Sequence, residues 1–228
     1  MGPSATASCV NKTGDPNTSL PPKCVEFAGY EWVVKKGTFD PSSNFWSDDS
    51  KNVSVDGQGL HLGITPRDIP SLWQSSEVIL NESLGYGRYT VTTTTPANQL
   101  DSNSVLGFFT YNFSDSAFTH REIDIEFSPL IGAQRGTTEH FSVQSAPETF
   151  DFVADSSPVT THSFEWRSDR IVFQSGGHAW TYAGQLVPQT GGEHFRINLW
   201  LNPLHTSNIS PTSKSEVHVV ISNFTFTP

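Results

Sequence analysis

Residues 121–127 read REIDIEF and place three carboxylates, those of Glu122, Asp124 and Glu126, at every second position. In a helix these acids would scatter around the surface, whereas in a strand alternate side chains share one face. The spacing therefore predicts a strand with an acidic face and an apolar face. Folding alone does not call for three like charges on one face, so this strand is also a candidate functional site.

Short apolar and aromatic runs recur on both sides of this segment, separated by turn signals such as VDGQG at 55–59 and SGGH at 175–178. Many short strands with regular turns favour an all-β fold, an antiparallel β-sandwich. Residues 1–24 are rich in Ser, Thr, Pro and Asn and are expected to form an irregular lead-in. Residues 25–228 are expected to form a single domain, since a chain of this length can bury one sizeable core.

The composition excludes several classes of partner. The formal net charge is −10, and Lys35 and Lys36 are the only adjacent basic residues, so binding to nucleic acid is not expected. No apolar run is long enough to cross a bilayer, and no zinc, phosphate or dinucleotide motif is present. We therefore expect a monomer with no cofactor, no metal and no membrane partner.

Seven Asn-x-Ser/Thr sequons and two cysteines favour a secreted protein, either extracellular or in a cell wall. A disulfide between Cys9 and Cys24 would close a short loop and stabilise the fold by roughly 3 kcal/mol. The alternative is two free thiols in a mobile tail. The sequons are Asn11, Asn17, Asn52, Asn81, Asn112, Asn208 and Asn223.

Two further strands place polar or aromatic side chains on one face. In GFFTY, at 107–111, Phe109 and Tyr111 share a face, and in INLWL, at 197–201, Asn198 and Trp200 do so. Placed beside the acidic strand, these faces would form a polar groove with aromatic walls. Such a groove suits a carbohydrate, whose C–H faces stack on rings and whose hydroxyls need hydrogen-bond partners.

The three acids have the chemistry that cleavage of a glycosidic bond requires. A retaining glycosidase holds two carboxyl groups ~5–5.5 Å apart, one protonated and one ionised. The Cα atoms of Glu122 and Glu126 are ~13 Å apart on a strand, so both side chains must lean over Asp124. Three neighbouring carboxyls cannot easily all ionise, so at least one pKa must rise. The alternative is a solvated acidic face, or one that binds Ca²⁺.

At this point the sequence resembles a known family. EIDIE at 122–126 is similar to the active-site strand of glycoside hydrolase family sixteen, in the form found in β-1,3-1,4-glucanases and wall transglycosylases. The likeness runs from about Tyr30 to the C-terminus, through GYGRY at 85–89, FFTY at 108–111, FEWRSDRIVF at 164–173 and NLW at 198–200. It implies a concanavalin A-like jelly roll with a substrate cleft on its concave face.

The resemblance also implies roles for individual residues. Glu122 corresponds to the nucleophile and Glu126 to the acid/base, with Asp124 tuning both. Many members bind a structural Ca²⁺ near the final strand, where this chain has Ser222 and Asn223, so no strong calcium site is expected. The residues that match cleft positions are Phe109, Tyr111, Asn198 and Trp200.

Three other residues are candidates for binding sugar. His120 shares the acidic face of an extended strand and either contacts the substrate or hydrogen-bonds locally. Trp73 either stacks on a sugar or anchors a loop, and Asn44 matches a cleft-loop segment.

Three functions remain open from the sequence. The leading hypothesis is a secreted, retaining endo-β-glucanase that hydrolyses β-1,3-1,4- or β-1,3-glucan. A cell-wall glucan transglycosylase would use the same residues but transfer the sugar to a hydroxyl instead of to water. A lectin on the same fold would bind the polysaccharide only, although glycan binding alone does not need three carboxylates.

Overall fold

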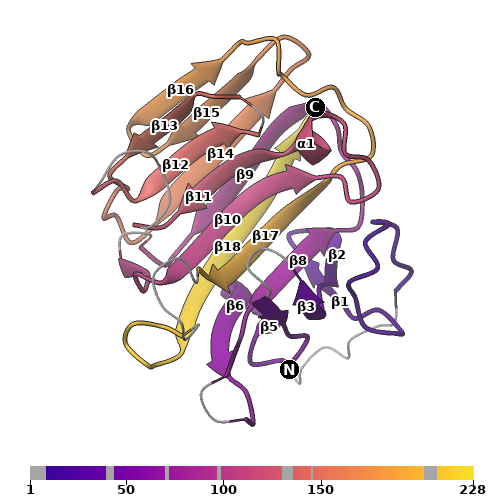
Figure 1. Cartoon of the computed structure of the whole chain (residues 1–228), viewed down its shortest axis with the longest axis vertical. Coiled ribbons are helices and arrows are strands. Elements are labelled where there is room, and N and C mark those ends of the chain that lie inside the picture. The colour runs from indigo at the N-terminus through magenta and orange to yellow at the C-terminus, as the bar shows by residue number, and fades with distance from the viewer. Residues whose placement is uncertain are drawn as a thin grey trace.

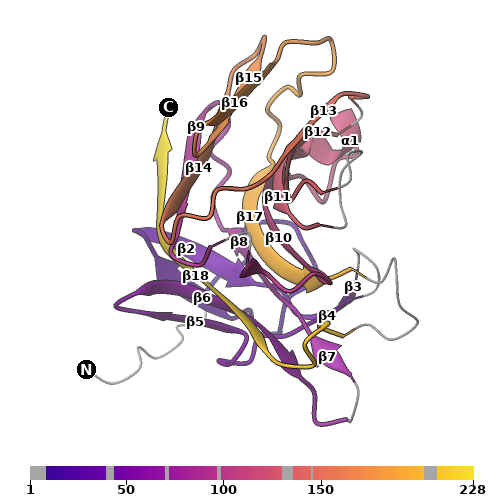
Figure 2. The same ribbon diagram turned by 90° about the vertical axis from the view of Figure 1, so that its left-hand side faces the viewer.

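The computed structural model describes residues 9–39, 44–69, 72–96, 99–129, 136–144, 146–202 and 210–228. Two antiparallel sheets pack face to face around an apolar core, as Figures 1 and 2 show from two directions. This arrangement is the predicted all-β sandwich of jelly-roll type.

One sheet carries the acidic segment, and we call it the cleft sheet. It has eight strands in the order β1 (Cys24–Phe27), β2 (Tyr30–Val34), β8 (Ser76–Leu80), β17 (His194–Leu201), β10 (Ser104–Tyr111), β11 (Ile123–Phe127), β12 (Glu139–Val143) and β13 (Thr149–Phe152). Neighbours in space are often far apart in sequence, so this sheet is built by non-local pairing.

The second sheet, which we call the outer sheet, closes the core from the other side. Its strands run β16 (His178–Tyr182), β15 (Ile171–Ser175), β14 (Thr160–Trp166), β9 (Gly87–Thr93), β18 (Val217–Thr227), β6 (Gly59–Pro66) and β5 (Val53–Asp56), with β7 (Trp73–Gln74) paired to β6. A separate hairpin joins β3 (Gly37–Phe39) to β4 (Asn44–Trp46).

The register of the cleft sheet sorts its side chains into two sets. Phe108 pairs with Ile197 on one side and with Ile125 on the other, and all three belong to the core. The next residue, Phe109, pairs with Arg196 and Asp124 on the opposite face. The alternation read from the sequence therefore separates core from cleft as expected.

The strand expected to include His120 and Arg121 is shorter than predicted, because β11 begins at Ile123. The four residues of α1 (Phe118–Arg121) have φ values of 51°, 49°, 64° and 59° and form a left-handed turn. Among the described residues, no helix is long and apolar enough to cross a membrane.

That left-handed turn is costly for residues with a side chain, at roughly 1 kcal/mol or more each. Local hydrogen bonds compensate. The backbone amide of Asn112 donates to the carbonyl of His120 at 2.7 Å, and the Thr110 hydroxyl donates to the carbonyl of Arg121 at 2.7 Å. The turn delivers Glu122 in an extended conformation, with φ −84° and ψ 124°, directly before β11.

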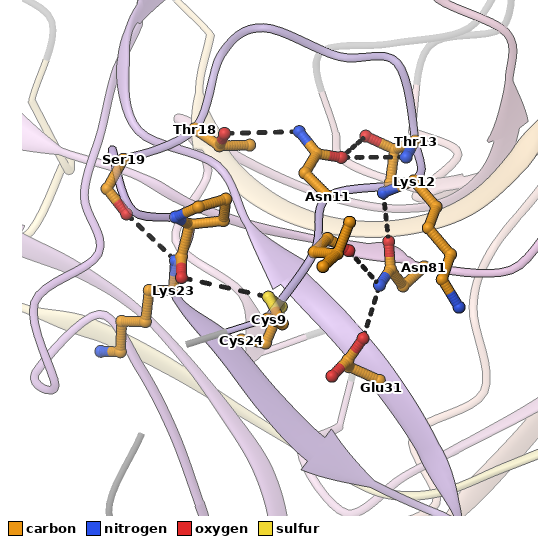
Figure 3. The surroundings of a disulfide bond; sticks show 12 residues. Cys9, Asn11, Lys12, Thr13, Thr18, Ser19, Lys23, Cys24, Glu31 and Asn81 are labelled. Carbon is orange, nitrogen blue, oxygen red and sulfur yellow. Dashed lines mark hydrogen bonds between the residues drawn. A yellow bond between two sulfur atoms is a disulfide. The ribbon is translucent and has the colours of Figure 1, made fainter. Parts of the chain in front are cut away.

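Residues 9–19, which we call the N-terminal strap, are mostly irregular and lie against the cleft sheet. The predicted disulfide between Cys9 and Cys24 is present and ties the start of the strap to β1 (Figure 3). Asn81, which follows β8, accepts a hydrogen bond from the amide of Lys12 at 2.8 Å and donates one to the carbonyl of Val10 at 2.8 Å. The strap is therefore fixed to the sandwich.

Candidate active site

A cleft of about 700 Å³ lies on the face of the cleft sheet that points away from the core. The curvature of β17 and β10 can be followed in Figure 2. The cleft is lined by acidic, amide, basic and aromatic side chains: Asp15, Asn17, Lys35, Thr38, Glu77, Phe109, Tyr111, Phe113, Glu122, Asp124, Glu126, Arg196, Asn198 and Trp200.

The three predicted carboxylates come together in this cleft. Glu122 precedes β11, and its carbonyl accepts the amide of Gln144 at 3.0 Å, so the sheet pairing continues past the start of the strand. Asp124 and Glu126 follow on the same face, opposite Phe109 and Gly107 of β10. The arrangement follows directly from the period of two.

Burial and mutual repulsion make these carboxyls hold their protons. Burial first, and then the charge of Asp124, raises the pKa of Glu126 to about 8. The pKa of Glu122 is raised by burial, by the charges of its two neighbours and by a hydrogen bond with Asp124, while Arg196 acts in the opposite direction. At neutral pH the group therefore carries fewer than three negative charges.

Asp124 is positioned by two donors from the neighbouring segment. The Ser142 hydroxyl and the Gln144 amide both donate to its Oδ2, each at 2.9 Å. Burial raises the pKa of Asp124 to about 6, although these hydrogen bonds and one from Glu122 favour its charged form. The hydrogen bond between Asp124 and Glu122 therefore shares one proton between two carboxyls.

The polar and aromatic residues that strand alternation predicted for the cleft also line it: Phe109, Tyr111, Asn198 and Trp200. Asn198 lies over Gly107, where a Cβ atom would come within 2.6 Å of the Asn198 Oδ1 atom, so any side chain at Gly107 would displace the amide. That Oδ1 is buried and has no hydrogen-bond partner within the described protein. Trp200 is 7% exposed and packs with Trp46 and Val105. An aromatic ring beside an unused acceptor fits a sugar hydroxyl.

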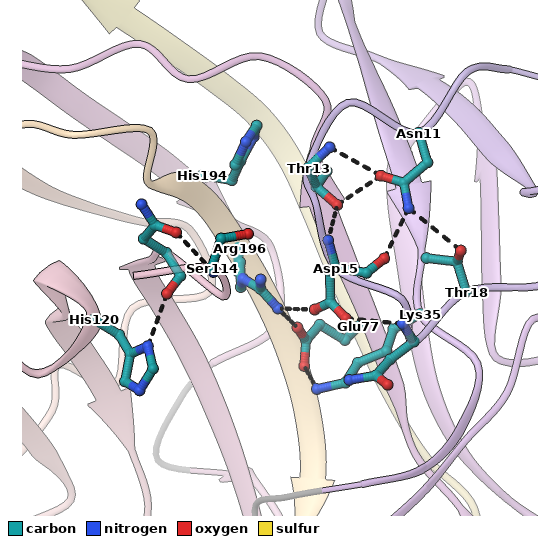
Figure 4. Close-up of polar contacts among 12 residues, drawn as sticks. Asn11, Thr13, Asp15, Thr18, Lys35, Glu77, Ser114, His120, His194 and Arg196 are labelled. Carbon is teal, nitrogen blue, oxygen red and sulfur yellow. Dashed lines mark hydrogen bonds and ion pairs between the residues drawn. The ribbon is translucent and has the colours of Figure 1, made fainter. Parts of the chain in front are cut away.

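A cluster of opposite charges occupies the end of the cleft near β8. Arg196 contacts Asp15 of the N-terminal strap at 2.8 Å and Glu77 at 2.9 Å, and Lys35 contacts Glu77 at 2.9 Å (Figure 4). All four side chains are 7% exposed or less, so each charge needs these partners. The Nε and Nη2 atoms of Arg196 have no partner among the described residues.

His120 does not lie on a strand face, but its ring is close to the cleft. It stacks on Tyr111 with ring centroids 4.5 Å apart, and its Nδ1 donates to the carbonyl of Asn112 at 2.8 Å. Arg196 lies over the Tyr111 ring, 5.0 Å from its centroid. His120 therefore supports the position of Tyr111 through direct ring contact.

Two candidates do not line the cleft. Trp73 is in β7, pairs with Pro66 of the outer sheet and packs on the core. Asn44 is buried, and its amide donates to the carbonyl of Leu201 and accepts from the Ser75 hydroxyl. Its side chain links β4 to β17 by hydrogen bonds, so the Asn44 amide has little capacity left to bind a ligand.

Several cleft residues were not predicted from the sequence. Arg196 shares its face with Asn198 and Trp200, and strand parity could have identified it. Strand parity could also have identified Glu77, which lies in the strand segment SEVIL at 76–80. Asp15 and Asn17 reach the cleft through an irregular segment, for which no periodic signal exists.

The fold and the site geometry define a jelly-roll sandwich with a carboxylate-lined cleft, and solved β-glucanases share the fold. The β-glucanase of Bacillus licheniformis has a TM-score of 0.69 and 22% identity, with 91% of this chain and 98% of that chain covered. A lichenase from a mouse hindgut metagenome has a TM-score of 0.62 and 18% identity, covering 86% and 99%. A Bacteroides ovatus family 16 endo-glucanase, in complex with G4G3G-2F-DNP, has a TM-score of 0.63 and 14% identity, covering 86% and 94%.

At these identities the likeness establishes a shared fold. No protein-family model matches the chain. No curated protein matches it either.

Proposed function

We propose that this protein is a retaining endo-β-glucanase that hydrolyses β-1,3-1,4- or β-1,3-glucan. The observation that carries the proposal is the gathering of Glu122, Asp124 and Glu126 in one cleft with raised pKa values. The shared fold with solved β-glucanases supports the choice of substrate class. A structural acidic patch would not need to hold protons at neutral pH.

In the first step, Glu122 attacks the anomeric carbon as a carboxylate. Glu126, whose pKa of about 8 keeps it protonated at neutral pH, donates its proton to the glycosidic oxygen as the bond from that oxygen to the anomeric carbon breaks. A glycosyl ester forms on Glu122, and the shortened glucan leaves with a new hydroxyl. The raised pKa of Glu122 favours their shared proton on Glu122 at rest, so this proton moves to Asp124 to leave Glu122 as the attacking carboxylate.

In the second step, Glu126 is ionised and removes a proton from water. The water oxygen bonds to the anomeric carbon, the ester bond to Glu122 breaks, and both residues return to their starting states. Two inversions at one carbon give net retention. Trp200 and Phe109 offer ring surface to the sugars, Tyr111 lines the cleft between His120 and Arg196, and Asn198 offers an acceptor.

Azide rescue tests this division of roles. We expect the Glu126→Ala variant to regain turnover in azide with an activated aryl β-glucoside oligosaccharide, because a good leaving group needs no acid and azide needs no base. The product should be a β-glycosyl azide, identified by NMR. An α-glycosyl azide would mean that the variant lacks the nucleophile, and it would reverse the roles of Glu122 and Glu126.

Product analysis tests the reaction type. Hydrolysis gives oligosaccharides no longer than the supplied glucan, whereas a transglycosylase also gives longer ones, which mass spectrometry resolves. Binding without any product from β-glucans, galactans or xyloglucan would favour a lectin and contradict the proposed enzyme.

Secretion is also part of the proposal, supported by the disulfide and one well-placed sequon. The side-chain amides of Asn52, Asn81 and Asn112 are buried and donate to backbone carbonyls, whereas Asn223 is exposed on β18. Asn208 lies outside the described residues. In a secretory host we expect a glycan on Asn223, seen as a glycosidase-sensitive mass that the Asn223→Gln variant lacks. An unchanged mass in that variant would contradict this assignment.

A further inference from the structure

The cleft face of β8 and β2 is covered, although it lies outside the core. Ile79 of β8 pairs with Arg196 on one side and with Val33 of β2 on the other, so these side chains share the cleft face. Ile79 and Val33 are both fully buried, yet neither belongs to the core cluster between the sheets. Another part of the chain must therefore exclude solvent from them.

The N-terminal strap provides that cover. Lys12 is bonded to Asn81 at one end of β8, Asp15 is bonded to Arg196, and the Lys36 amide donates to the carbonyl of Asn17 at 2.9 Å beyond the end of β2. The strap thus crosses the face that contains Ile79 and Val33. Asp15 and Asn17 form part of the cleft lining.

The position of the N-terminal strap limits the length of the open cleft on the side of β8. The strap reaches β17 through the contact of Asp15 with Arg196, and β17 is two strand spacings from β11, with β10 between them. Two strand spacings are ~10 Å, and a pyranose ring is about as wide as one spacing, ~4.8 Å. About two sugar rings therefore fit between the three carboxyls and the strap.

The polar atoms left without partners lie in the same part of the cleft. They are Oδ1 of Asn198 and Nε and Nη2 of Arg196, and both residues are 4% exposed or less. An unpaired buried donor or acceptor costs about 1–3 kcal/mol, which a ligand hydroxyl can recover. The space in front of the strap is therefore suited to a sugar unit.

We propose that the N-terminal strap ends the substrate cleft on the β8 side and restricts that side to about two bound sugar units, so that further units of the glucan turn away into solvent. This inference rests on the proposed binding of glucan in the cleft. Residues 9–19 would thus set the length of glucan that binds on this side, and the contact of Asp15 with Arg196 would hold them in place.

A binding series with oligosaccharides of increasing length tests the strap. We would measure dissociation constants by calorimetry in the Glu122→Gln background, which prevents cleavage. Affinity should stop rising once the oligosaccharide fills the cleft. With the strap released by Cys9→Ser, Cys24→Ser and Asp15→Ala, affinity should rise over at least one further unit, by about threefold or more.

A milder variant and a matched control guard against misfolding. Asp15→Ala alone keeps the disulfide and should show the same extension to a smaller degree. Asp169→Ala removes an exposed aspartate of the β14–β15 turn and should leave the series unchanged. A folded Asp15→Ala protein with saturation at the original length would overturn the strap proposal.

The outcomes separate this inference from the proposed function. If the series behaves as expected but the wild-type protein cleaves no glucan, the hydrolase proposal fails and the strap proposal stands. If the wild-type protein cleaves glucan and the strap variants bind an unchanged length, only the strap proposal fails. If the Glu122→Gln protein binds no oligosaccharide at all, the strap proposal is also overturned.

Discussion

Two groups of buried charges lie in the same cleft and are built in opposite ways. On β11, three carboxylates gather and their pKa values rise. Near β8, acidic and basic side chains alternate, with Arg196 between Asp15 and Glu77. The like charges keep protons on the carboxyls, whereas the opposite charges hold the surrounding segments in place. The effect of burying a charge therefore depends on the sign of its neighbours: like neighbours raise the pKa of a carboxyl, whereas opposite neighbours form ion pairs with it.

The largest effect should follow from removing a carboxylate from the first group. Glu122→Gln and Glu126→Gln should each lower kcat roughly 10³-fold or more, because each removes either the nucleophile or the acid. Initial rates on β-glucan measure this, and circular dichroism should show an unchanged fold. Glu216→Gln, at an exposed glutamate, is the matched control. Full activity in either cleft variant would remove that residue from its proposed role.

Breaking the second group should instead lower stability. Arg196→Met leaves Asp15 and Glu77 buried without their shared cation, which should reduce the free energy of unfolding by about 3–5 kcal/mol. Urea denaturation measures the loss, with Arg170→Met, at an exposed arginine, as the control. A loss below about 1 kcal/mol would show that the opposite-charge group does not hold the strap as described.

The pH dependence of stability should distinguish the two groups further. The unfolded state ionises Glu126 above its ordinary pKa near 4.5, while the folded state keeps the proton up to about pH 8. Folding is therefore penalised increasingly as the pH rises between these values, and the penalty is absent below them. Glu126→Gln should stabilise the fold by about 2 kcal/mol at pH 8 and by little at pH 4, since partial contact with solvent reduces the full effect. Thermal unfolding across this range measures it, and a pH-independent difference would contradict it.

The smallest effect concerns a donor to Asp124. Ser142→Ala removes a hydrogen bond that favours the ionised form, so the pKa of Asp124 should rise by about half a unit. The acidic limb of the pH–rate profile should move to higher pH by that amount. Ser213→Ala, at an exposed serine, should leave the profile in place. Movement of the limb to lower pH would mean that Ser142 does not donate to the charged form.

The sequence predicted the parts of the site that lie on regular strands. A period of two places Glu122, Asp124 and Glu126 on one face, and pairing brings that face beside Phe109 and Asn198. This works because the same alternation that buries the core also exposes the cleft. The all-β sandwich followed from the many short strands between turns.

The sequence predicted the positions of residues outside the long, regular strands less well. His120 was expected on a strand face but lies in a left-handed turn, a conformation set by contacts rather than by its own preference. Trp73 and Asn44 lie outside the cleft on the short strands β7 and β4, whose two and three residues give too little alternation to assign a face. Asp15 reaches Arg196 across 181 positions of sequence, a contact that local patterns do not encode.

The pairing order of the cleft sheet has a consequence for biosynthesis. Strand β11, which contains Asp124 and Glu126, has β10 beside it, but β10 needs β17, which ends at Leu201, to complete the floor of the cleft. Non-local pairings of this kind form slowly, and a nascent chain that stops before β17 lacks Arg196, Asn198 and Trp200. Synthesis must therefore proceed through β17 before the residues of the cleft can come together, so the proposed glucanase could not act on polysaccharide earlier in translation.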